Sequence, residues 1–219
     1  AVESGQEVEV SEYGVKFFIN LEAQKTGFYV DQRDSRRYLK ELARGKRVLD
    51  VCCYTGGFAL SAAAGGASEV TGVDSSEPAL ALARRNAQLN GIDACRFVKA
   101  DMGEFVASAV KAGEQWDIVV LDPPKLAPSR SALRNATRKY VRLNAQAMKL
   151  VRPGGLLMTC SCSGAMTQSG TFYDCLKEAS KQARRQVTVV RKAGAGPDHT
   201  FHMAYPEGLY LTNVLLHVH

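Results

Sequence analysis

Short apolar runs alternate with amphipathic stretches along most of the chain. The apolar runs are "RVLDVCC", "SEVTGVD", "CRFVKAD", "WDIVVLD", "GGLLMTCSCS", "QVTVVRK" and "LYLTNVLLHV". Continuous Val, Ile and Leu runs are typical of strands that are buried on both faces of a sheet. Stretches with helical spacing separate most of these runs, as crossover helices separate parallel strands. The pattern therefore predicts a doubly wound α/β fold with a mostly parallel, seven-stranded sheet.

The two ends of the pattern differ from its middle. Only residues 193–208, without a helical stretch, separate the last two runs, so we expect an antiparallel hairpin at one edge of the sheet. Near the N-terminus, two β-prone runs flank "EYG" and predict a second hairpin. In "DSRRYLKELARG" we expect a helix that Asp34 caps and Gly45 closes.

The domain organisation follows from this reading. We expect a β-rich N-terminal segment over residues 1–33 and one main domain over residues 34–219. The chain begins at Ala1 and its first methionine is Met102, which we interpret as a processed or truncated piece of a longer protein.

Composition narrows the class of protein. The 219 residues are enough for one sizeable core, and 28 basic against 22 acidic residues give a net charge of +6, which suits a nucleic-acid partner. Six cysteines are spread over a chain without a signal peptide, which favours a reducing intracellular compartment, the cytoplasm or a eukaryotic organelle. No apolar run approaches the roughly 20 residues that span a bilayer, so no membrane partner is expected.

Candidate binding residues follow the ends of the first three runs, where parallel sheets bind ligands. After the first run, Gly56 and Gly57 let the backbone approach a ligand at the start of a helix. The expected binding loop consists of Tyr54, Thr55, Gly56, Gly57 and Phe58. This loop lacks the G-x-G-x-x-G pattern, which argues against a nicotinamide or flavin dinucleotide.

Two carboxylates extend this candidate site. Asp74, with Ser75 beside it, can accept both hydroxyls of a ribose, although it can also cap the next helix. Asp101, followed by Met102, can accept the exocyclic amine of an adenine, although an exposed helix cap is its alternative. A glycine loop, a ribose acid and an adenine acid at three successive strand ends together predict S-adenosylmethionine.

The fourth run ends in a rigid corner, Asp122-Pro123-Pro124. Each proline fixes φ and removes an N–H group, so the corner stays extended. Such a corner holds a carboxylate and backbone carbonyls against a planar base, next to the methyl group of the cofactor. We therefore expect Asp122 to serve both the cofactor and the reaction.

Five motifs occur in a specific order: "QKTGFYVDQRDSR", "CCYTGGFALSAAAGGASEVTGVDSS", "VVLDPPK", "TCSCSGAM" and "DHTFHMAYPEGLYL". With them the chain resembles the catalytic domain of the bacterial family of large-subunit ribosomal RNA 5-methylcytosine methyltransferases. The resemblance implies a class I methyltransferase (Rossmann-like) fold, S-adenosylmethionine, and methyl transfer to carbon 5 of a cytosine in large-subunit rRNA, without a metal. Family members carry a PUA domain and a small β-rich domain ahead of this one, and residues 1–30 resemble the tail of the β-rich part. Gln32 and Arg33 are expected to close over the methionine end of the cofactor, with structural salt bridges as their alternative.

The resemblance also suggests a nucleophile. Carbon 5 of cytosine attacks a methyl sulfonium only after a thiolate has added to carbon 6. In the wider class of RNA 5-methylcytosine enzymes this thiol follows the Gly-Gly of the fifth strand, a position that corresponds to Cys162. Cys160 shares its strand face but lies deeper, and we interpret it as a core residue. Lys125 stands where many such enzymes have a second cysteine, so the base that removes the carbon 5 proton is not identified.

Several alternatives stay open at this point. Cys160 and Cys162 could form half of a zinc site with Cys52-Cys53 and His199 or His202, could form a disulfide, or Cys162 could be structural. The protein could instead methylate a nitrogen of guanine or adenine, or bind S-adenosylmethionine or RNA without catalysis during ribosome assembly. Asp198, His199, Glu207 and Tyr210 match the family pattern, and we assign them no role.

Overall fold

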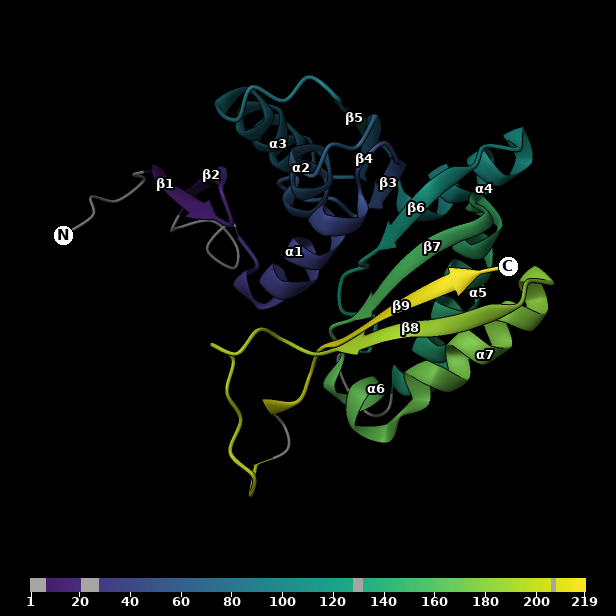
Figure 1. Ribbon diagram of the computed structural model, residues 1–219. Helices are drawn as coiled ribbons and strands as arrows, with labels where there is room; N and C mark the ends of the chain where they lie inside the picture. Colours follow the sequence, from purple (N-terminus) through teal and green to yellow (C-terminus); the bar gives the residue numbers. More distant parts are fainter. Residues whose placement is uncertain (1–6, 21–27, 128–131, 206–207) are drawn as a thin grey trace. The chain divides into compact units, whose positions relative to one another are not determined.

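The computed structural model describes residues 7–20, 28–127, 132–205 and 208–219 (Figure 1). The chain forms two compact units, Ala1–Ala100 and Asp101–His219. Glu207 and the first four residues of the "QKTGFYVDQRDSR" motif lie outside the described residues. The boundary at residue 33 stays a prediction.

The first unit opens with the predicted hairpin, which is confirmed. Its strands are β1 (Glu7–Glu12) and β2 (Val15–Asn20). Tyr13 and Gly14 between them have φ of 48° and 81°, as a two-residue turn of type I′ requires. The side chain of Asn86 accepts a hydrogen bond from the Phe18 N–H at 2.8 Å, which fixes β2 on the helix that carries Asn86. A buried cluster beneath the hairpin consists of Val15, Phe17, Phe28, Leu60 and Ala87.

Three parallel strands and three helices complete the first unit. The strands are β3 (Arg47–Val51), β4 (Glu69–Asp74) and β5 (Cys95–Lys99). The helices are α1 (Arg33–Leu42), α2 (Gly57–Ala64) and α3 (Glu77–Leu89), with a 3₁₀ turn η2 (Val30–Gln32) ahead of α1. The predicted Asp34 cap is wrong, because η2 runs directly into α1 and Gln32 occupies the N-cap position. Asp34 lies in the first turn instead and accepts a hydrogen bond from the Tyr13 hydroxyl at 3.1 Å.

Four strands form the sheet of the second unit. They are β6 (Trp116–Leu121), β7 (Val151–Ser161), β8 (Val187–Ala193) and β9 (Thr212–Val218). Strand β7 is parallel to β6 and antiparallel to β9, and β9 is antiparallel to β8. All six residues of β6 are buried, whereas β8 is a partly exposed edge strand. The sheet order is β5-β4-β3-β6-β7-β9-β8, so the predicted seven-stranded, mostly parallel sheet with an antiparallel edge is confirmed.

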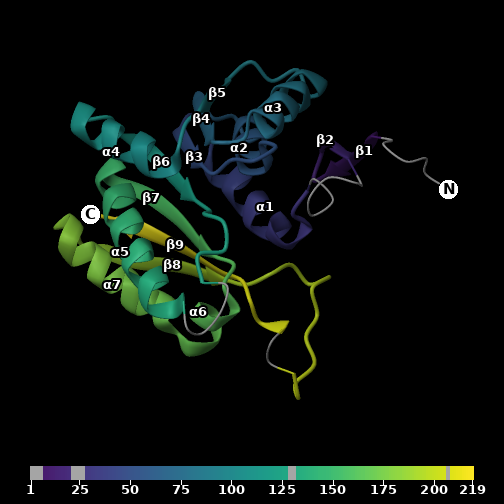
Figure 2. The ribbon, with the colours of Figure 1, turned by 180° about the vertical axis from the view of Figure 1, so that it is seen from behind.

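The helices of the second unit are α4 (Met102–Ala112), α5 (Leu133–Leu150), α6 (Gly164–Ser169) and α7 (Thr171–Ala183). Helices α5 and α7 lie side by side against the strands, which is visible from both sides (Figures 1 and 2). The buried rings of Tyr140 on α5 and Phe172 on α7 meet edge to face at 5.3 Å between centroids. Among the described helices, none is long and apolar enough to cross a membrane.

Candidate active site

The loop after β3 has a tightly constrained backbone. The N–H groups of Cys52 and Cys53 both donate to the Val73 carbonyl, at 2.8 and 3.0 Å, which ties the loop to β4. Cys52 and Tyr54 have positive φ values of 66° and 49°, which few non-glycine residues adopt. Such strained conformations occur preferentially where a loop must present its backbone to a ligand.

Gly56 shows why the loop needs glycine. It is the N-cap of α2 with φ at 87°, and a Cβ atom there would lie 3.3 Å from both Ala83 and Leu60. At Gly57 a Cβ atom would lie 3.2 Å from the Cδ of Arg36. The first turn of α2 is thus presented as bare backbone, and Phe58 is buried behind it. A bare helix N-terminus suits the negatively charged or polar groups of a cofactor.

Asp50 supports this loop from below and was not singled out in the sequence. Its side chain is 1% exposed, and its Oδ2 accepts a hydrogen bond from the Ala59 N–H at 2.9 Å. The carbonyl of buried Thr55 accepts a hydrogen bond from Asn86 Nδ2 at 3.2 Å. The sequence signal for Asp50 was its place in the first apolar run, where a charged residue is unusual.

Both carboxylate oxygens of Asp74 accept backbone hydrogen bonds, and its contact with a ribose stays a prediction. Its Oδ2 accepts from the Tyr54 N–H and its Oδ1 from the Ser76 N–H, both at 2.9 Å. A carboxylate offers about four acceptor positions, so both oxygens keep capacity for a further hydrogen bond. The N-cap of α3 is Ser76, whose hydroxyl accepts from Ala79, so capping α3 is not the role of Asp74. Ser75 is exposed beside it.

The segment ahead of α1 lies against the same loop. The ring of Tyr29 meets the ring of Tyr54 edge to face at 5.5 Å, and burial raises the pKa of Tyr54. Gln32 is buried, whereas Arg33 is partly exposed with its Nε 3.8 Å from Asp34. Contact of Gln32 and Arg33 with the cofactor stays a prediction.

Arg36 is a residue that the sequence analysis missed. It is 3% exposed, and its guanidinium donates to both carboxylate oxygens of Glu12 at 2.6 Å and to the Tyr29 carbonyl at 2.8 Å. It therefore joins the hairpin to the Tyr29 segment. A helical pattern alone does not reveal this role, because the carboxylate partner lies 24 residues earlier.

Asp101, in the second unit, is an exposed helix cap. Its Oδ1 accepts from the Gly103 and Glu104 N–H groups at 2.8 and 3.1 Å, and Met102 begins α4. This is the alternative that the sequence left open, and the contact of Asp101 with an adenine amine stays a prediction.

The Asp122 corner and Cys162 come together in the second unit. Cys162 follows the last residue of β7, is partly exposed, and its Sγ lies 3.9 Å from the Pro123 carbonyl oxygen. The Ala127 N–H donates to the Ser163 hydroxyl at 3.2 Å, so a second contact joins the same two segments. Asp122 is partly exposed and Lys125 is exposed. The two motifs therefore form one site in this unit.

The two cysteines of "TCSCSGAM" have different surroundings. Cys160 is fully buried, as the sequence predicted, and its sulfur accepts a hydrogen bond from Asn213 Nδ2 at 3.1 Å. Between them, the Ser161 hydroxyl points the other way and donates to the Tyr140 hydroxyl at 3.0 Å. Burial raises the pKa of Tyr140. All six cysteines lie in the described residues, and none of them forms a disulfide.

The described residues contain no group of three or more side chains that could hold a metal ion.

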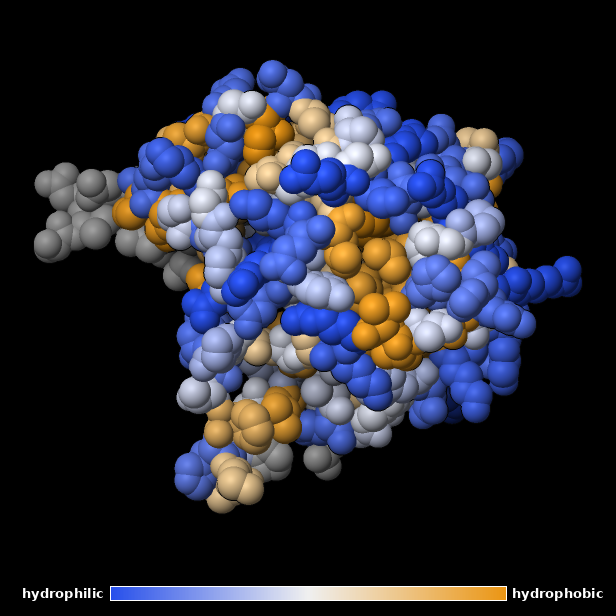
Figure 3. All heavy atoms as spheres, viewed as in Figure 1, coloured by the Kyte–Doolittle hydropathy of each residue, from blue (hydrophilic) through white to orange (hydrophobic). Residues whose placement is uncertain are grey.

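At the other end of α6, the Thr167 hydroxyl donates to the Tyr210 carbonyl at 3.0 Å and holds the base of the loop between β8 and β9. His199 Nδ1 lies 3.2 Å from Asp198 in that loop. Phe201 and Met203 of this loop are exposed apolar side chains. Figure 3 shows orange and tan atoms at the lower left, where the loop lies in Figure 1.

The fold and the loop after β3 define a class I methyltransferase, and the comparison with known families agrees. Residues 2–199 match the S-adenosylmethionine-dependent methyltransferase family, so the chain belongs to this family. The predicted cofactor, S-adenosylmethionine, is therefore confirmed as the cofactor of the family.

Individual relatives are similar over nearly the whole chain. Ribosomal RNA large subunit methyltransferase I of Photobacterium profundum is 43% identical over 98% of this chain and 56% of its own length. The protein of that name from Aeromonas hydrophila is 43% identical over 93% of this chain and 52% of its own length. The chain thus spans about half the length of these curated relatives.

Solved structures show the same fold. A Streptococcus mutans protein described as a SAM-dependent methyltransferase superposes with a TM-score of 0.87 at 24% identity, over 98% of this chain and 56% of its own. The tRNA m1G37 methyltransferase of M. jannaschii superposes with a TM-score of 0.69 at 14% identity, over 100% of this chain and 58% of its own.

Proposed function

We propose that this chain is the catalytic part of an RNA methyltransferase that methylates carbon 5 of a cytosine in large-subunit rRNA, with Cys162 as the nucleophile. One observation carries the proposal: a partly exposed thiol at the carboxyl end of β7 lies 3.9 Å from the carbonyl of the Asp122-Pro123-Pro124 corner. The similarity to two bacterial rRNA large subunit methyltransferases supports the choice of RNA. An rRNA substrate also fits the predicted intracellular location, because ribosomes are assembled there.

Most of the residues that would hold the cofactor lie in the first unit, and Asp101, Met102 and Asp122 of the second unit complete the proposed set. Asp74 would accept the ribose hydroxyls, and the backbone of Gly56 and Gly57, at the start of α2, would lie against the cofactor. Tyr54, Thr55 and Phe58 would shape the loop around it. When bound, S-adenosylmethionine supplies an electrophilic methyl group.

The second unit would act on the base. The Cys162 thiolate adds to carbon 6 of cytosine, and the electron pair of the 5,6 double bond becomes available at carbon 5. Carbon 5 then forms its bond to the methyl group as the bond between that methyl group and the cofactor sulfur breaks, with the electron pair of the broken bond staying on sulfur. Carbon 5 next loses its proton to a base, and the bond between carbon 6 and the Cys162 sulfur breaks, which restores the 5,6 double bond and the thiolate. Asp122 and the Pro123 carbonyl would contact the ring on which charge develops, as preorganised polar groups do in other enzymes. Lys125, which follows the corner, is the third proposed catalytic residue beside Cys162 and Asp122.

A trapped adduct provides a direct test. RNA that carries 5-fluorocytosine at the target should form a stable covalent complex with the protein, because fluorine cannot leave carbon 5 as a proton does. The target base must be unpaired or flipped out of a helix, so protein-free rRNA is the substrate of choice. Cys162→Ala should abolish both the adduct and methyl transfer and leave cofactor binding unchanged.

Cys160→Ala is the matched control, since it removes the neighbouring thiol and should reduce only stability. Methyl transfer by Cys162→Ala at the normal rate would disprove the carbon 5 mechanism and favour a nitrogen of guanine or adenine. If Cys160→Ala were inactive and Cys162→Ala active, the nucleophile would be Cys160 rather than Cys162. Mass spectrometry of the nucleosides distinguishes these products.

A further inference from the structure

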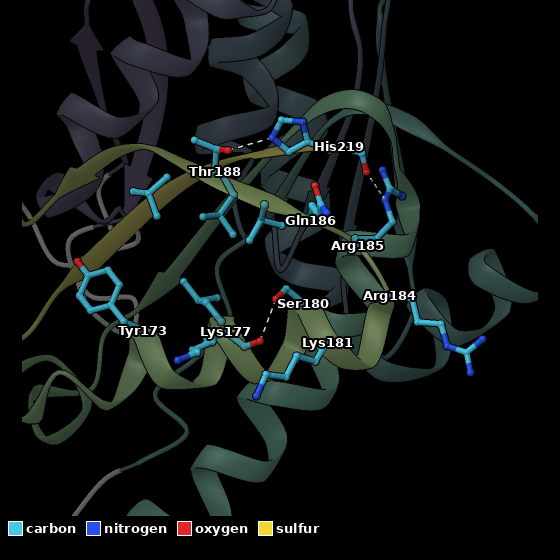
Figure 4. Close-up of a pocket in the computed structure, with 13 residues that line it drawn as sticks. Tyr173, Lys177, Ser180, Lys181, Arg184, Arg185, Gln186, Thr188 and His219 are labelled. Atoms are coloured by element: carbon cyan, nitrogen blue, oxygen red, sulfur yellow. Dashed lines mark hydrogen bonds between the residues drawn. The ribbon is translucent and has the colours of Figure 1, made fainter.

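A cavity lies in the second unit between helix α7 and strands β8 and β9 (Figure 4). Its volume is about 710 Å³, within the range of about 300–1,000 Å³ that is typical of ligand sites. Leu216, which lines it, pairs with Leu157 of β7, whereas Ser161, just before Cys162, pairs with Thr212 at the other end of β9. The cavity is therefore distinct from the site around Cys162.

Cationic side chains border this cavity. Its four Lys and Arg residues are Lys177, Lys181, Arg184 and Arg185, and no Asp or Glu is among the described residues that line it. Lys177 and Lys181 lie one turn apart on α7, on the side of the cavity opposite Thr188 and Gln186 (Figure 4). The lining is thus complementary to a negatively charged ligand.

One of these four cations, Arg185, is already held by backbone carbonyls. Arg185 donates to the carbonyls of Met148 and Val151, at 3.2 and 2.9 Å, and so stabilises the junction of α5 and β7. Lys181 forms a surface ion pair with Glu178 at 3.6 Å, with both side chains about half exposed or more. Lys177 and Arg184 have no acidic partner among the described residues.

The floor of the cavity is apolar. Leu176 and Leu216 line it and are buried, and Val187, Val189 and Tyr173 line it nearer to solvent. The Lys192 ammonium lies 4.2 Å from the centroid of the Tyr173 ring and adds a further cation there. Cations near the last turn of α7 favour its dipole, but Lys177 lies in the middle of that helix. The helix dipole therefore explains neither the position of Lys177 nor the apolar residues that line the cavity. Single-stranded nucleic acid has the matching chemistry, since its phosphates bind cations and its bases pack on apolar and aromatic surfaces.

We propose that this cavity binds a single-stranded segment of the RNA substrate at a distance from the methylated base. Lys177, Lys181 and Arg184 contact phosphates, and a base rests on the apolar floor beside Tyr173. The choice of RNA rests on the proposed function. The substrate is then held at two places on the second unit, and an RNA that fills only the site around Cys162 binds less tightly.

A double substitution tests this cavity directly. Binding of a fluorescent single-stranded oligoribonucleotide is measured at several salt concentrations for Lys177→Gln/Lys181→Gln. The control is Lys99→Gln/Lys111→Gln, which removes the same charge from exposed lysines elsewhere. The cavity variant should lose about tenfold in affinity at low salt, and its salt slope should fall by about 1.4, or about 0.7 per lost phosphate contact. The control should change neither quantity appreciably.

Equal losses in both double variants would overturn the proposal, because they would indicate attraction by overall charge. Displacement of the RNA by poly-glutamate as effectively as by unlabelled RNA would also overturn it in favour of an acidic peptide. The measurement requires no methyl transfer, so it is independent of Cys162. An active Cys162→Ala would contradict the proposed function alone, and wild-type binding by the cavity variant would contradict this inference alone.

Discussion

The buried pair of Glu12 and Arg36 leads to the most quantitative prediction for this protein. The two side chains are 10% and 4% exposed, and two hydrogen bonds of 2.6 Å join them. Glu12→Gln removes the negative charge and leaves the Arg36 cation buried. Removal of one partner from a buried pair costs about 3–5 kcal/mol. Because the glutamine amide keeps one acceptor, we expect a loss near the lower end, about 3 kcal/mol.

Urea denaturation at neutral pH measures this loss as a change in midpoint at constant slope. Glu41→Gln is the matched control, since Glu41 pairs with Arg37 on the same helix at 3.4 Å but both side chains are exposed. It should leave the free energy of unfolding close to that of the wild type. A cost below about 1 kcal/mol for Glu12→Gln would refute the argument that the pair is desolvated.

The same substitution should affect the cofactor. Arg36 donates to the Tyr29 carbonyl, and the ring of Tyr29 meets that of Tyr54, so a displaced guanidinium should loosen the loop after β3 through Tyr29. Calorimetry at a temperature where Glu12→Gln is fully folded should show weaker S-adenosylmethionine binding. Unchanged affinity together with the stability loss would confine the pair to a structural role.

Two further predictions concern cofactor affinity and pH. Asp74→Ala should weaken S-adenosylmethionine binding by about 1.5–3 kcal/mol, because the ribose hydroxyls lose a charged acceptor; calorimetry measures this, and unchanged affinity would remove Asp74 from the site. Burial raises the pKa of Cys95 to about 12 and that of Cys175 to about 11, from an ordinary value of 9.0. Above pH 9 the unfolded chain therefore binds fewer protons than the native one, so the free energy of unfolding should fall as the pH rises from about 9 to about 11. Denaturation at several pH values tests this. The free energy of unfolding should fall less steeply with pH in Cys175→Ala than in the wild type, and an equally steep fall would argue against the contribution of Cys175.

The strands of this protein could be predicted from the sequence because burial on both faces leaves a local signature. Strand β6 is buried at all six positions, and its sequence "WDIVVL" is apolar at all but one. The first hairpin was also predictable, since Tyr13-Gly14 between two β-prone runs indicates a tight turn. In each case the signal lies within a few neighbouring residues.

Very short helical elements and contacts between distant residues could not be predicted. Helix α6 is only six residues long, and no amphipathic period can be recognised over "GAMTQS". Arg36 reads as one charge among several on α1, and its burial depends on Glu12 in another element. Asp34 was predicted to be a cap because Asp is a common N-cap residue, whereas the preceding 3₁₀ turn had already started the helix.

The contrast between Cys160 and Cys162 arises from the pairing of strands. If β7 continued, period two would place both thiols on the same face. Pairing with β9 stops at Ser161, which lies opposite Thr212, the first residue of β9. Cys160 lies opposite Asn213 within the ladder, and the Asn213 side chain bonds its sulfur. Cys162 is one residue beyond the ladder, where the chain turns into α6 and the thiol becomes partly exposed beside Pro123. The end of the β7–β9 ladder, rather than any property of the thiols, therefore determines which of the two cysteines is exposed.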